Sequence, residues 1–182
     1  MTNHCVAFLR AINVGGRFVK MDILRQQFET LGLSQVQTYI QSGNVIFETA
    51  ETDYAALEQK IEDQLQAALG FQVPTLIRSA FKIVTVAQYQ PFPKSKYGEK
   101  SVLYISFLKE EPAPDRQRQL YEFASAIDEF HVHGRQVYWL MHKHQGQSKF
   151  TNNKLEKVLK VPATRRNIST VRKIMAKYFG NE

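Results

Sequence analysis

The segment from Arg10 to Gly16 carries residue types that bind anions. Arg10 and Asn13 stand just before the pair Gly15-Gly16. An arginine donates charge-assisted hydrogen bonds to phosphate or carboxylate groups, and adjacent glycines let backbone N–H groups approach a ligand closely. A helix is expected to follow, and its N-terminus favours a negative charge. Together these features predict a binding loop for a phosphate or a carboxylate.

A second polar group, Gln41, Ser42 and Asn44, lies at the expected tip of a hairpin. The strand before Arg10 and the strand after Asn44 are expected to be antiparallel neighbours, so the loop and the tip lie at the same end of the sheet. We therefore assign all three residues to the same predicted ligand site. The alternative interpretation is that the glycines only shape a turn and that Asn44 only adopts a positive φ.

Basic residues concentrate near the C-terminus. From residue 142 to residue 182 there are ten Lys or Arg and two Glu, a net charge of +8, although the whole chain carries only +7. Such a segment can bind an anionic partner such as nucleic acid, or it can be a solvated surface. The residues predicted to contact nucleic acid or another anion are Lys149, Arg165, Arg166, Asn167, Arg172 and Lys173.

The elements that position the first group follow from the periodicity of apolar residues. The pattern predicts strands at 5–9, 36–41, 45–48 and 73–78, with helices at 21–31 and 53–69. Thr52 is the expected N-cap of the second helix, and a turn centred on Gly43-Asn44 pairs Ile40 with Phe47. This β-α-β-β-α-β order is that of the split βαβ, or ferredoxin-like, unit, an antiparallel sheet with both helices on one face.

The pattern then starts again after a stretch rich in Pro and Lys. Residues 80–89 favour a strand by propensity, and residues 90–100 are predicted to be a linker. The repeat comprises strands at 101–108 and 163–166, helices at 115–124 and 151–160, a hairpin at 129–141, and a terminal helix capped by Ser169. The predicted fold is therefore α+β, two tandem ferredoxin-like units at 1–89 and 101–182, the second with a basic C-terminal helix.

Four motifs carry a resemblance to a known family. Residues 9–16, 39–47, 148–151 and 163–167 read LRAINVGG, YIQSGNVIF, SKFT and ATRRN, and they resemble the motifs of the bacterial domain of unknown function 1697 family. The resemblance implies a duplicated α+β fold and a helix rather than a strand at 80–89, and it implies no established activity. The sequence departs from the family at Ala11, where glycine is usual, and at Ile168-Ser169, where Trp-Asn is frequent.

Composition sets limits on the other classes of function. The apolar run at 5–9 is short and is followed at once by Arg10, so we expect neither a signal peptide nor a membrane anchor. Cys5 is the one cysteine of the chain, which suggests a buried thiol in a reducing cytoplasm. We predict no cofactor. We also predict no metal, because the spacing of the histidines at 131, 133, 142 and 144 does not allow one coordination shell.

Two functions of different classes fit these observations. The first is a cytoplasmic binding protein for a phosphate-bearing ligand, a small molecule or nucleic acid. The second is a small hydrolase of acyl phosphates or phosphoesters, in which Arg10 or Arg17 stabilises developing charge and Asn13 or Asn44 orients water. The sequence does not indicate the identity of the ligand or the oligomeric state.

Overall fold

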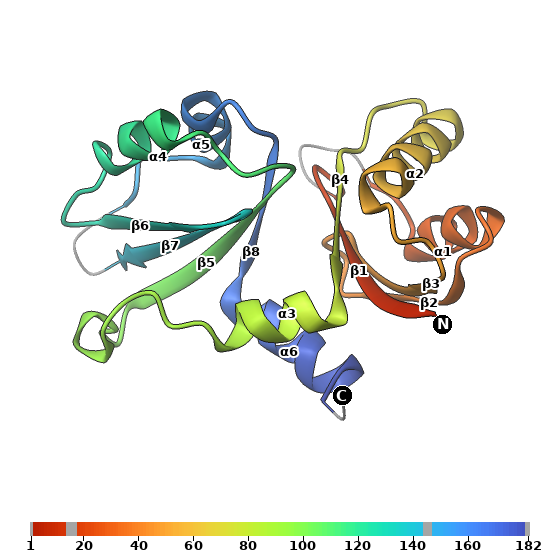
Figure 1. Ribbon diagram of the computed structural model, residues 1–182, viewed down its shortest axis with the longest axis horizontal. Coiled ribbons are helices and arrows are strands. Elements are labelled where there is room, and N and C mark those ends of the chain that lie inside the picture. Colours follow the sequence, from red (N-terminus) through yellow and green to blue (C-terminus); the bar gives the residue numbers. More distant parts are fainter. Residues whose placement is uncertain (1, 14–17, 144–146, 181–182) are drawn as a thin grey trace. The chain divides into compact units, whose positions relative to one another are not determined.

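The computed structural model describes residues 2–13, 18–143 and 147–180. The chain divides into two compact units, the first made of residues 1–86 and 174–182 and the second of residues 87–173. The described residues form two four-stranded antiparallel sheets and six α-helices (Figure 1). None of these helices has the length and apolar character needed to cross a membrane.

The first sheet has the strand order β2-β3-β1-β4. Its elements, in chain order, are β1 (Asn3–Leu9), α1 (Met21–Thr30), β2 (Ser34–Tyr39), β3 (Asn44–Thr49), α2 (Tyr54–Leu69) and β4 (Thr75–Ser79). Helix α3 (Ala80–Gln88) starts directly after β4, so the helix implied by the family resemblance is confirmed and the strand favoured by propensity is wrong.

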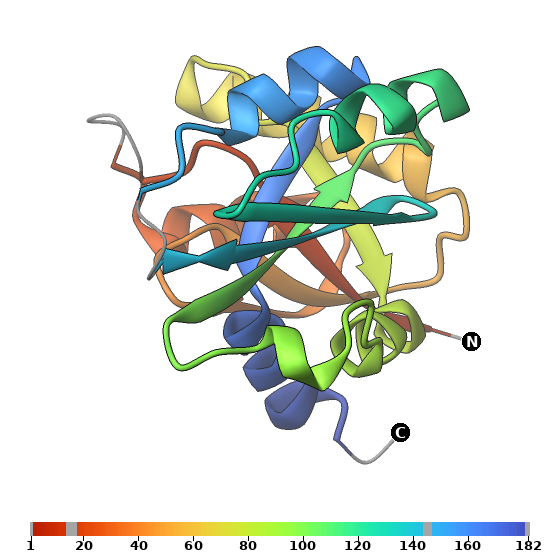
Figure 2. The ribbon, with the colours of Figure 1, turned by 90° about the vertical axis from the view of Figure 1, so that its left-hand side faces the viewer.

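The second sheet repeats this order as β6-β7-β5-β8. A short 3-10 helix, η1 (Lys94–Lys96), precedes it, followed by β5 (Ser101–Leu108), α4 (Pro114–Tyr121), β6 (Asp128–His133), β7 (Gln136–His142), α5 (Asn152–Leu159), β8 (Ala163–Asn167) and α6 (Ile168–Tyr178). Helices α4 and α5 lie side by side over one face of this sheet in both ribbon views (Figures 1 and 2). Apart from the strand favoured at 80–89, the predicted strands and helices of both halves are thus confirmed in type and order.

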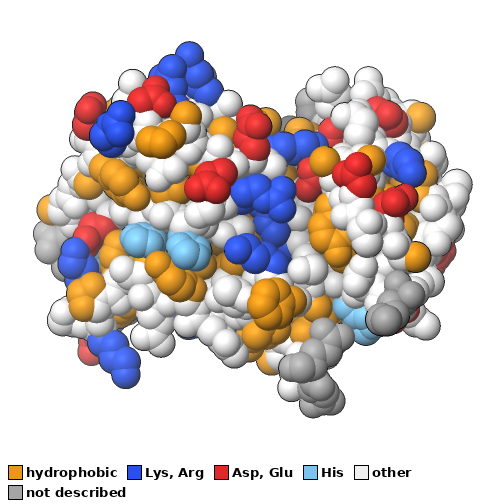
Figure 3. All heavy atoms as spheres, viewed as in Figure 1, with side chains coloured by type: hydrophobic (Ala, Val, Ile, Leu, Met, Phe, Trp, Pro, Cys, Tyr) orange, Lys and Arg blue, Asp and Glu red, His pale blue; other side chains and the backbone are white. Residues whose placement is uncertain are grey.

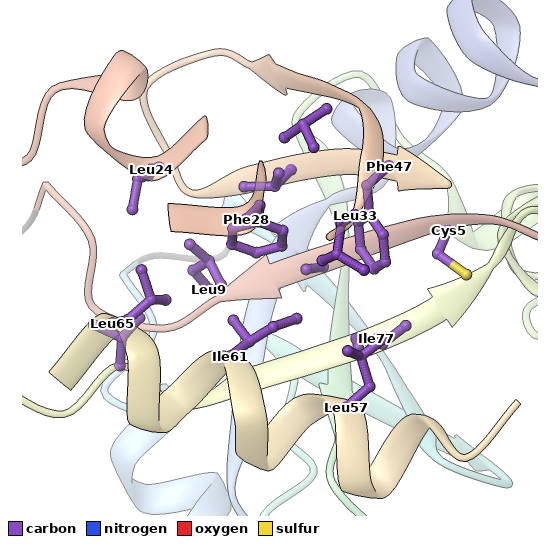
Figure 4. Packing of buried hydrophobic residues seen from close by; sticks show 14 of the residues in the cluster. Cys5, Leu9, Leu24, Phe28, Leu33, Phe47, Leu57, Ile61, Leu65 and Ile77 are labelled. Carbon is purple, nitrogen blue, oxygen red and sulfur yellow. The ribbon is translucent and has the colours of Figure 1, made fainter. Parts of the chain in front are cut away.

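The core of the first unit lies between one face of its sheet and helices α1 and α2 (Figure 4). The Phe28 and Phe47 rings meet edge to face with centroids 5.6 Å apart. Burial raises the pKa of the Cys5 thiol, which makes this residue an inert part of the core, as expected. The fully buried members include Cys5, Leu9, Phe47 and Ile77 from the strands and Leu24, Phe28, Ile61 and Leu65 from the helices.

The predicted register of the first hairpin is wrong. Tyr39 pairs with Asn44 and Thr38 with Val45, so the turn comprises residues 40–43 and Ile40 is not in a strand. Ile40 takes a left-handed backbone with φ of 51° and is 52% exposed. A turn that begins at a β-branched residue with positive φ is not foreseen from propensity. The shift moves pairs by an even number of residues, so Val45 still faces the core.

Two predicted helix caps are also wrong by one or two residues. Asp53, not Thr52, caps α2, because its Oδ1 accepts a hydrogen bond from Ala56 N at 3.0 Å. Asn167, not Ser169, stands before α6, and its Oδ1 accepts from Ser169 N at 2.8 Å. Each capping side chain satisfies a backbone donor that the first turn leaves unpaired. Asn167, predicted to contact an anion, therefore has a structural role in the described chain.

Candidate functional site

The loop after β1 and the tip of the β2-β3 hairpin meet at one end of the first sheet. Phe8 pairs with Asn44, Leu9 N donates to Gly43 O at 2.8 Å, and the Asn13 side-chain amide donates to Gln41 O at 2.8 Å. The expectation that the two polar segments share an end of the sheet agrees with these contacts.

Two asparagines at this end are occupied in closing the loops. The Asn13 Oδ1 accepts from Val19 N at 2.7 Å. The fully buried Asn44 donates from Nδ2 to Tyr39 O and to the Ser42 hydroxyl, at 3.0 and 2.8 Å. Asn44 does not adopt the positive φ of the alternative interpretation; Gly43 does, at 71°. Gly15, Gly16 and Arg17 lie outside the described residues, so the anion site proposed for this loop stays a prediction.

A concave site lies in the second unit. It is a pocket of about 740 Å³ between strands β5, β7 and β8 and the segment that leads into α5. Strand β5 contributes Tyr104, β7 contributes Met141 and β8 contributes Arg165. The remaining lining residues come from the connection between β7 and α5 and from the start of α5: Lys143, Gln147, Ser148, Phe150, Thr151 and Asn152.

Arg165 is the charged centre of this pocket. Its guanidinium carbon lies 4.7 Å from the ring centroids of both Tyr104 and Trp139, and these two rings face each other across paired strands. Among the described residues the guanidinium donates no hydrogen bond and forms no ion pair. Burial lowers the pKa of Arg165 although Tyr104 and Asp128 nearby raise it, and an arginine keeps its charge at neutral pH. The rings therefore hold in place a cation whose donors are open to a ligand.

Asp128 braces the wall of the pocket. Its Oδ1 accepts from the Trp139 indole N–H and its Oδ2 from the Ser148 hydroxyl, both at 2.7 Å. The Ser148 oxygen in turn accepts from Phe150 N at 3.0 Å. Because both carboxylate oxygens already accept charge-assisted bonds, Asp128 fixes the 148–150 segment to the sheet.

The start of helix α5 forms the floor beside Arg165. Thr151 caps the helix by accepting from Lys154 N at 3.1 Å. The Asn152 amide donates to Ala163 O at 2.9 Å, which ties α5 to β8. Its buried Oδ1 has no hydrogen-bond partner in the part of the chain that the structure describes, and an unsatisfied buried acceptor is costly.

Of the basic residues predicted to contact an anion, only Arg165 lines this pocket. Lys149 lines a neighbouring cavity. Arg166 bonds to Thr164 Oγ1 and Arg165 O, and burial lowers its pKa to about 10. Arg172 Nε donates to Ala87 O at 3.2 Å, and Lys173 is exposed on α6. The sequence analysis did not assign Tyr104, Lys143 or Asn152 to a site, although all three line the pocket. The alternation of side chains along the strand was the available signal for Tyr104, and the position directly after the helix cap Thr151 was the signal for Asn152.

The histidines form hydrogen-bonded clusters on the second sheet. Histidine side chains lie beside hydrophobic ones over β6 in Figure 3. His142 bonds through Nδ1 to the Ser101 hydroxyl at 3.0 Å and through Nε2 to Glu129 at 2.9 Å. Glu129 also pairs with Lys96. This series of polar contacts therefore links η1 to β5, β6 and β7. Within residues 2–13, 18–143 and 147–180 no three His, Cys, Asp or Glu side chains could hold a metal ion.

Comparison with known proteins identifies the family. The family model described as "Protein of unknown function (DUF1697)" matches residues 1–138. The chain belongs to this family. A solved structure, the conserved bacterial protein SP0830 from Streptococcus pneumoniae, is similar with a TM-score of 0.74 and 25% sequence identity, and the match covers 96% of this chain and 97% of that chain. No curated protein matches the chain.

The structure explains two sequence features of this DUF1697 chain, the residue at position 11 and the two motifs near the C-terminus. Ala11, which stands where the family usually has glycine, has φ of 60°, a conformation that glycine adopts without strain. The motifs at 148–151 and 163–167 lie beyond the family match, and they meet in the second unit, where Ser148, Phe150 and Thr151 line the same pocket as Arg165.

Proposed function

We propose that this DUF1697 protein binds a phosphate-bearing ligand in the pocket around Arg165. The observation that carries the proposal is the half-buried guanidinium, held on two aromatic rings, which donates no hydrogen bond to any described residue. A planar guanidinium with open donors matches the oxygens of a phosphate group. Lys143 adds a second positive charge to the lining.

The N-terminus of α5 supports the same ligand. The first turn of a helix presents unpaired N–H groups and a partial positive charge to an anion. Thr151 and Asn152 place this turn in the lining of the pocket. The partly exposed Tyr104 ring offers a surface on which a planar group of the ligand can stack.

Two finer statements accompany this proposal. We infer that each unit is ferredoxin-like, supported by the β-α-β-β-α-β order and by the strand orders β2-β3-β1-β4 and β6-β7-β5-β8. We also propose a cytoplasmic location, since a single buried thiol suits a reducing compartment.

We favour a binding function over the hydrolase alternative because the Asn44 amide is already hydrogen-bonded within the protein. That alternative needs Asn44 or Asn13 to orient a water molecule, but Asn44 is fully buried and its amide bonds to Tyr39 O and Ser42. Asn13 likewise bonds to Val19 N and Gln41 O. Neither amide is free to hold an attacking water in the described structure.

Isothermal titration with pyrophosphate and with nucleoside monophosphates tests the proposal. Arg165→Ala should weaken binding by roughly 10- to 100-fold, the value of a charge-assisted hydrogen bond. Arg165→Lys should recover only part of this, because lysine keeps the charge but loses the planar fork. Arg118→Ala, which removes the same charge from an exposed position of α4 outside the pocket, is the matched control. Binding that is equal in Arg165→Ala and Arg118→Ala would contradict the proposal.

A further inference from the structure

Four aromatic rings form a continuous row through the pocket wall of the second unit. The ring centroids are 6.4 Å apart from Tyr104 to Trp139, 5.3 Å from Trp139 to Phe150, and 5.4 Å from Phe150 to Phe123. The four residues come from β5, from β7, from the segment before α5 and from the turn after α4. Trp139 and Phe150 are buried, whereas Phe123 is 37% exposed.

Each half of this row carries its own cation. Arg165 lies over the first two rings, at 4.7 Å from each centroid. Lys154 Nζ lies 4.3 Å from the centroid of Phe123 and 5.6 Å from that of Phe150. The arrangement of two rings and one cation therefore occurs twice, and the outer ring of each pair is the one open to solvent.

A second cavity, of about 270 Å³, surrounds the Lys154 half. It shares Gln147 and Phe150 with the Arg165 pocket, so the two cavities adjoin. Lys149 and Phe123 also line it. Its charged lining residues are Lys149, Lys154 and Asp128, so the cavity has a net positive charge.

We propose that the ligand is a single-stranded nucleic acid that places one nucleotide in each cavity; this inference rests on the proposed function. A single strand repeats one phosphate and one flat base per nucleotide. A surface that binds it without a strict sequence alternates cations with rings on which bases stack. Arg165 with Tyr104 and Lys154 with Phe123 form two such steps, whereas a single phosphorylated metabolite needs only the first.

Fluorescence anisotropy competition between UMP and the 5′-phosphorylated dinucleotide pUpU tests the two steps. The dinucleotide should bind roughly tenfold or more tightly than UMP, because a second stacked base contributes that much. Lys154→Ala and Phe123→Leu should remove most of the extra affinity for pUpU and leave the affinity for UMP unchanged. Arg165→Ala should weaken the binding of both ligands. Lys157→Ala, an exposed lysine on the same helix that lines neither cavity, is the matched control.

The salt dependence of pUpU binding gives an independent measurement. Loss of the Lys154 contact should reduce the slope of log affinity against log salt by about 0.7, as one phosphate contact on a single strand requires. Lys157→Ala should change it by much less.

The possible outcomes separate the inference from the function beneath it. If UMP binds in an Arg165-dependent manner but pUpU binds no more tightly, the second step is refuted and the proposed function stands. If Lys154→Ala and Lys157→Ala have equal effects, the binding reflects overall charge and the inference fails. A phosphopeptide that binds more tightly than pUpU with the same Lys154 dependence overturns the nucleic-acid class. Failure of every phosphate ligand to bind refutes the proposed function itself.

Discussion

Arg165 and Trp139 form the contact on which the candidate site depends: the guanidinium carbon lies 4.7 Å from the indole ring centroid. Trp139 is fully buried and its N–H donates to Asp128, so the ring cannot move without breaking a buried hydrogen bond. The cation is thereby positioned before any ligand arrives, which reduces the entropic cost of binding. This relationship also makes the tryptophan a reporter for the pocket.

Ala11→Gly should stabilise the protein. Ala11 has φ of 60°, a left-handed conformation that costs a Cβ-bearing residue about 1–2 kcal/mol. Glycine avoids this strain, but its greater conformational entropy in the unfolded chain offsets roughly 0.5–1 kcal/mol of the gain. The free energy of unfolding, measured by urea denaturation, should rise by up to about 1 kcal/mol. Ala67→Gly, at an exposed position of α2, should instead lower it by about 1 kcal/mol. Equal losses from both variants would contradict a strained loop.

Gly43→Ala should destabilise the first unit strongly. A Cβ at Gly43 would lie 3.0 Å from Leu9 Cβ and 3.1 Å from Ile12 Cβ, and φ is 71°. The backbone strain and the overpacking together should cost about 2–4 kcal/mol of unfolding free energy. Gly32→Ala is the control, because its φ is 79° but nothing lies within 4 Å of the added Cβ. The difference between the two variants measures the contact between the hairpin tip and the loop, and no difference would refute that contact.

The stability of the second unit should fall as the pH is lowered from about 6.5. His131 accepts or donates a hydrogen bond with the Tyr89 hydroxyl at 3.0 Å, and burial and the neighbouring His133 lower its pKa. The folded state thus binds this proton less readily than the unfolded chain, so stability is full above the unfolded pKa and is lost as the pH falls towards the folded pKa. His131→Gln should flatten this part of a pH series of thermal unfolding.

Glu129 should contribute a separate acid transition. Burial raises its pKa, but hydrogen bonds from Lys96 and His142 outweigh this and hold the pKa below the usual value of 4.5. The stabilisation is therefore present above 4.5 and is lost at lower pH. Glu129→Gln should remove that transition and leave the His131 transition in place. A single transition that neither substitution alters would show that other groups control the acid response.

The sequence predicted the order of elements because apolar periodicity and turn residues are local signals. It did not predict the hairpin register, since Ile40 takes a positive φ that propensity disfavours. The same limit applies to the candidate site. Arg165 was identified from its charge, but Tyr104 and Trp139 meet it only through strand pairing across the sheet.

Lys154 shows the limit most clearly. The charge pattern of its helix favours a solvated surface position, and Lys154 is exposed on α5, but the pattern does not indicate which side chain lies beside it. In the fold its ammonium group lies over Phe123, which comes from the turn after α4. A contact of this kind depends on the packing of α4 beside α5, and the periodicity of one helix contains no information about its neighbour.

The central claim is that a phosphate group binds at Arg165, and the chain's single tryptophan tests it most directly. In a ¹H–¹⁵N correlation spectrum the Trp139 indole N–H gives the one signal of its kind. Titration with pyrophosphate or UMP should shift this signal in a saturable manner, the shift should disappear in Arg165→Ala, and it should persist in Arg118→Ala. An indole signal that does not move at any ligand concentration, or that moves equally in Arg165→Ala, would contradict the account.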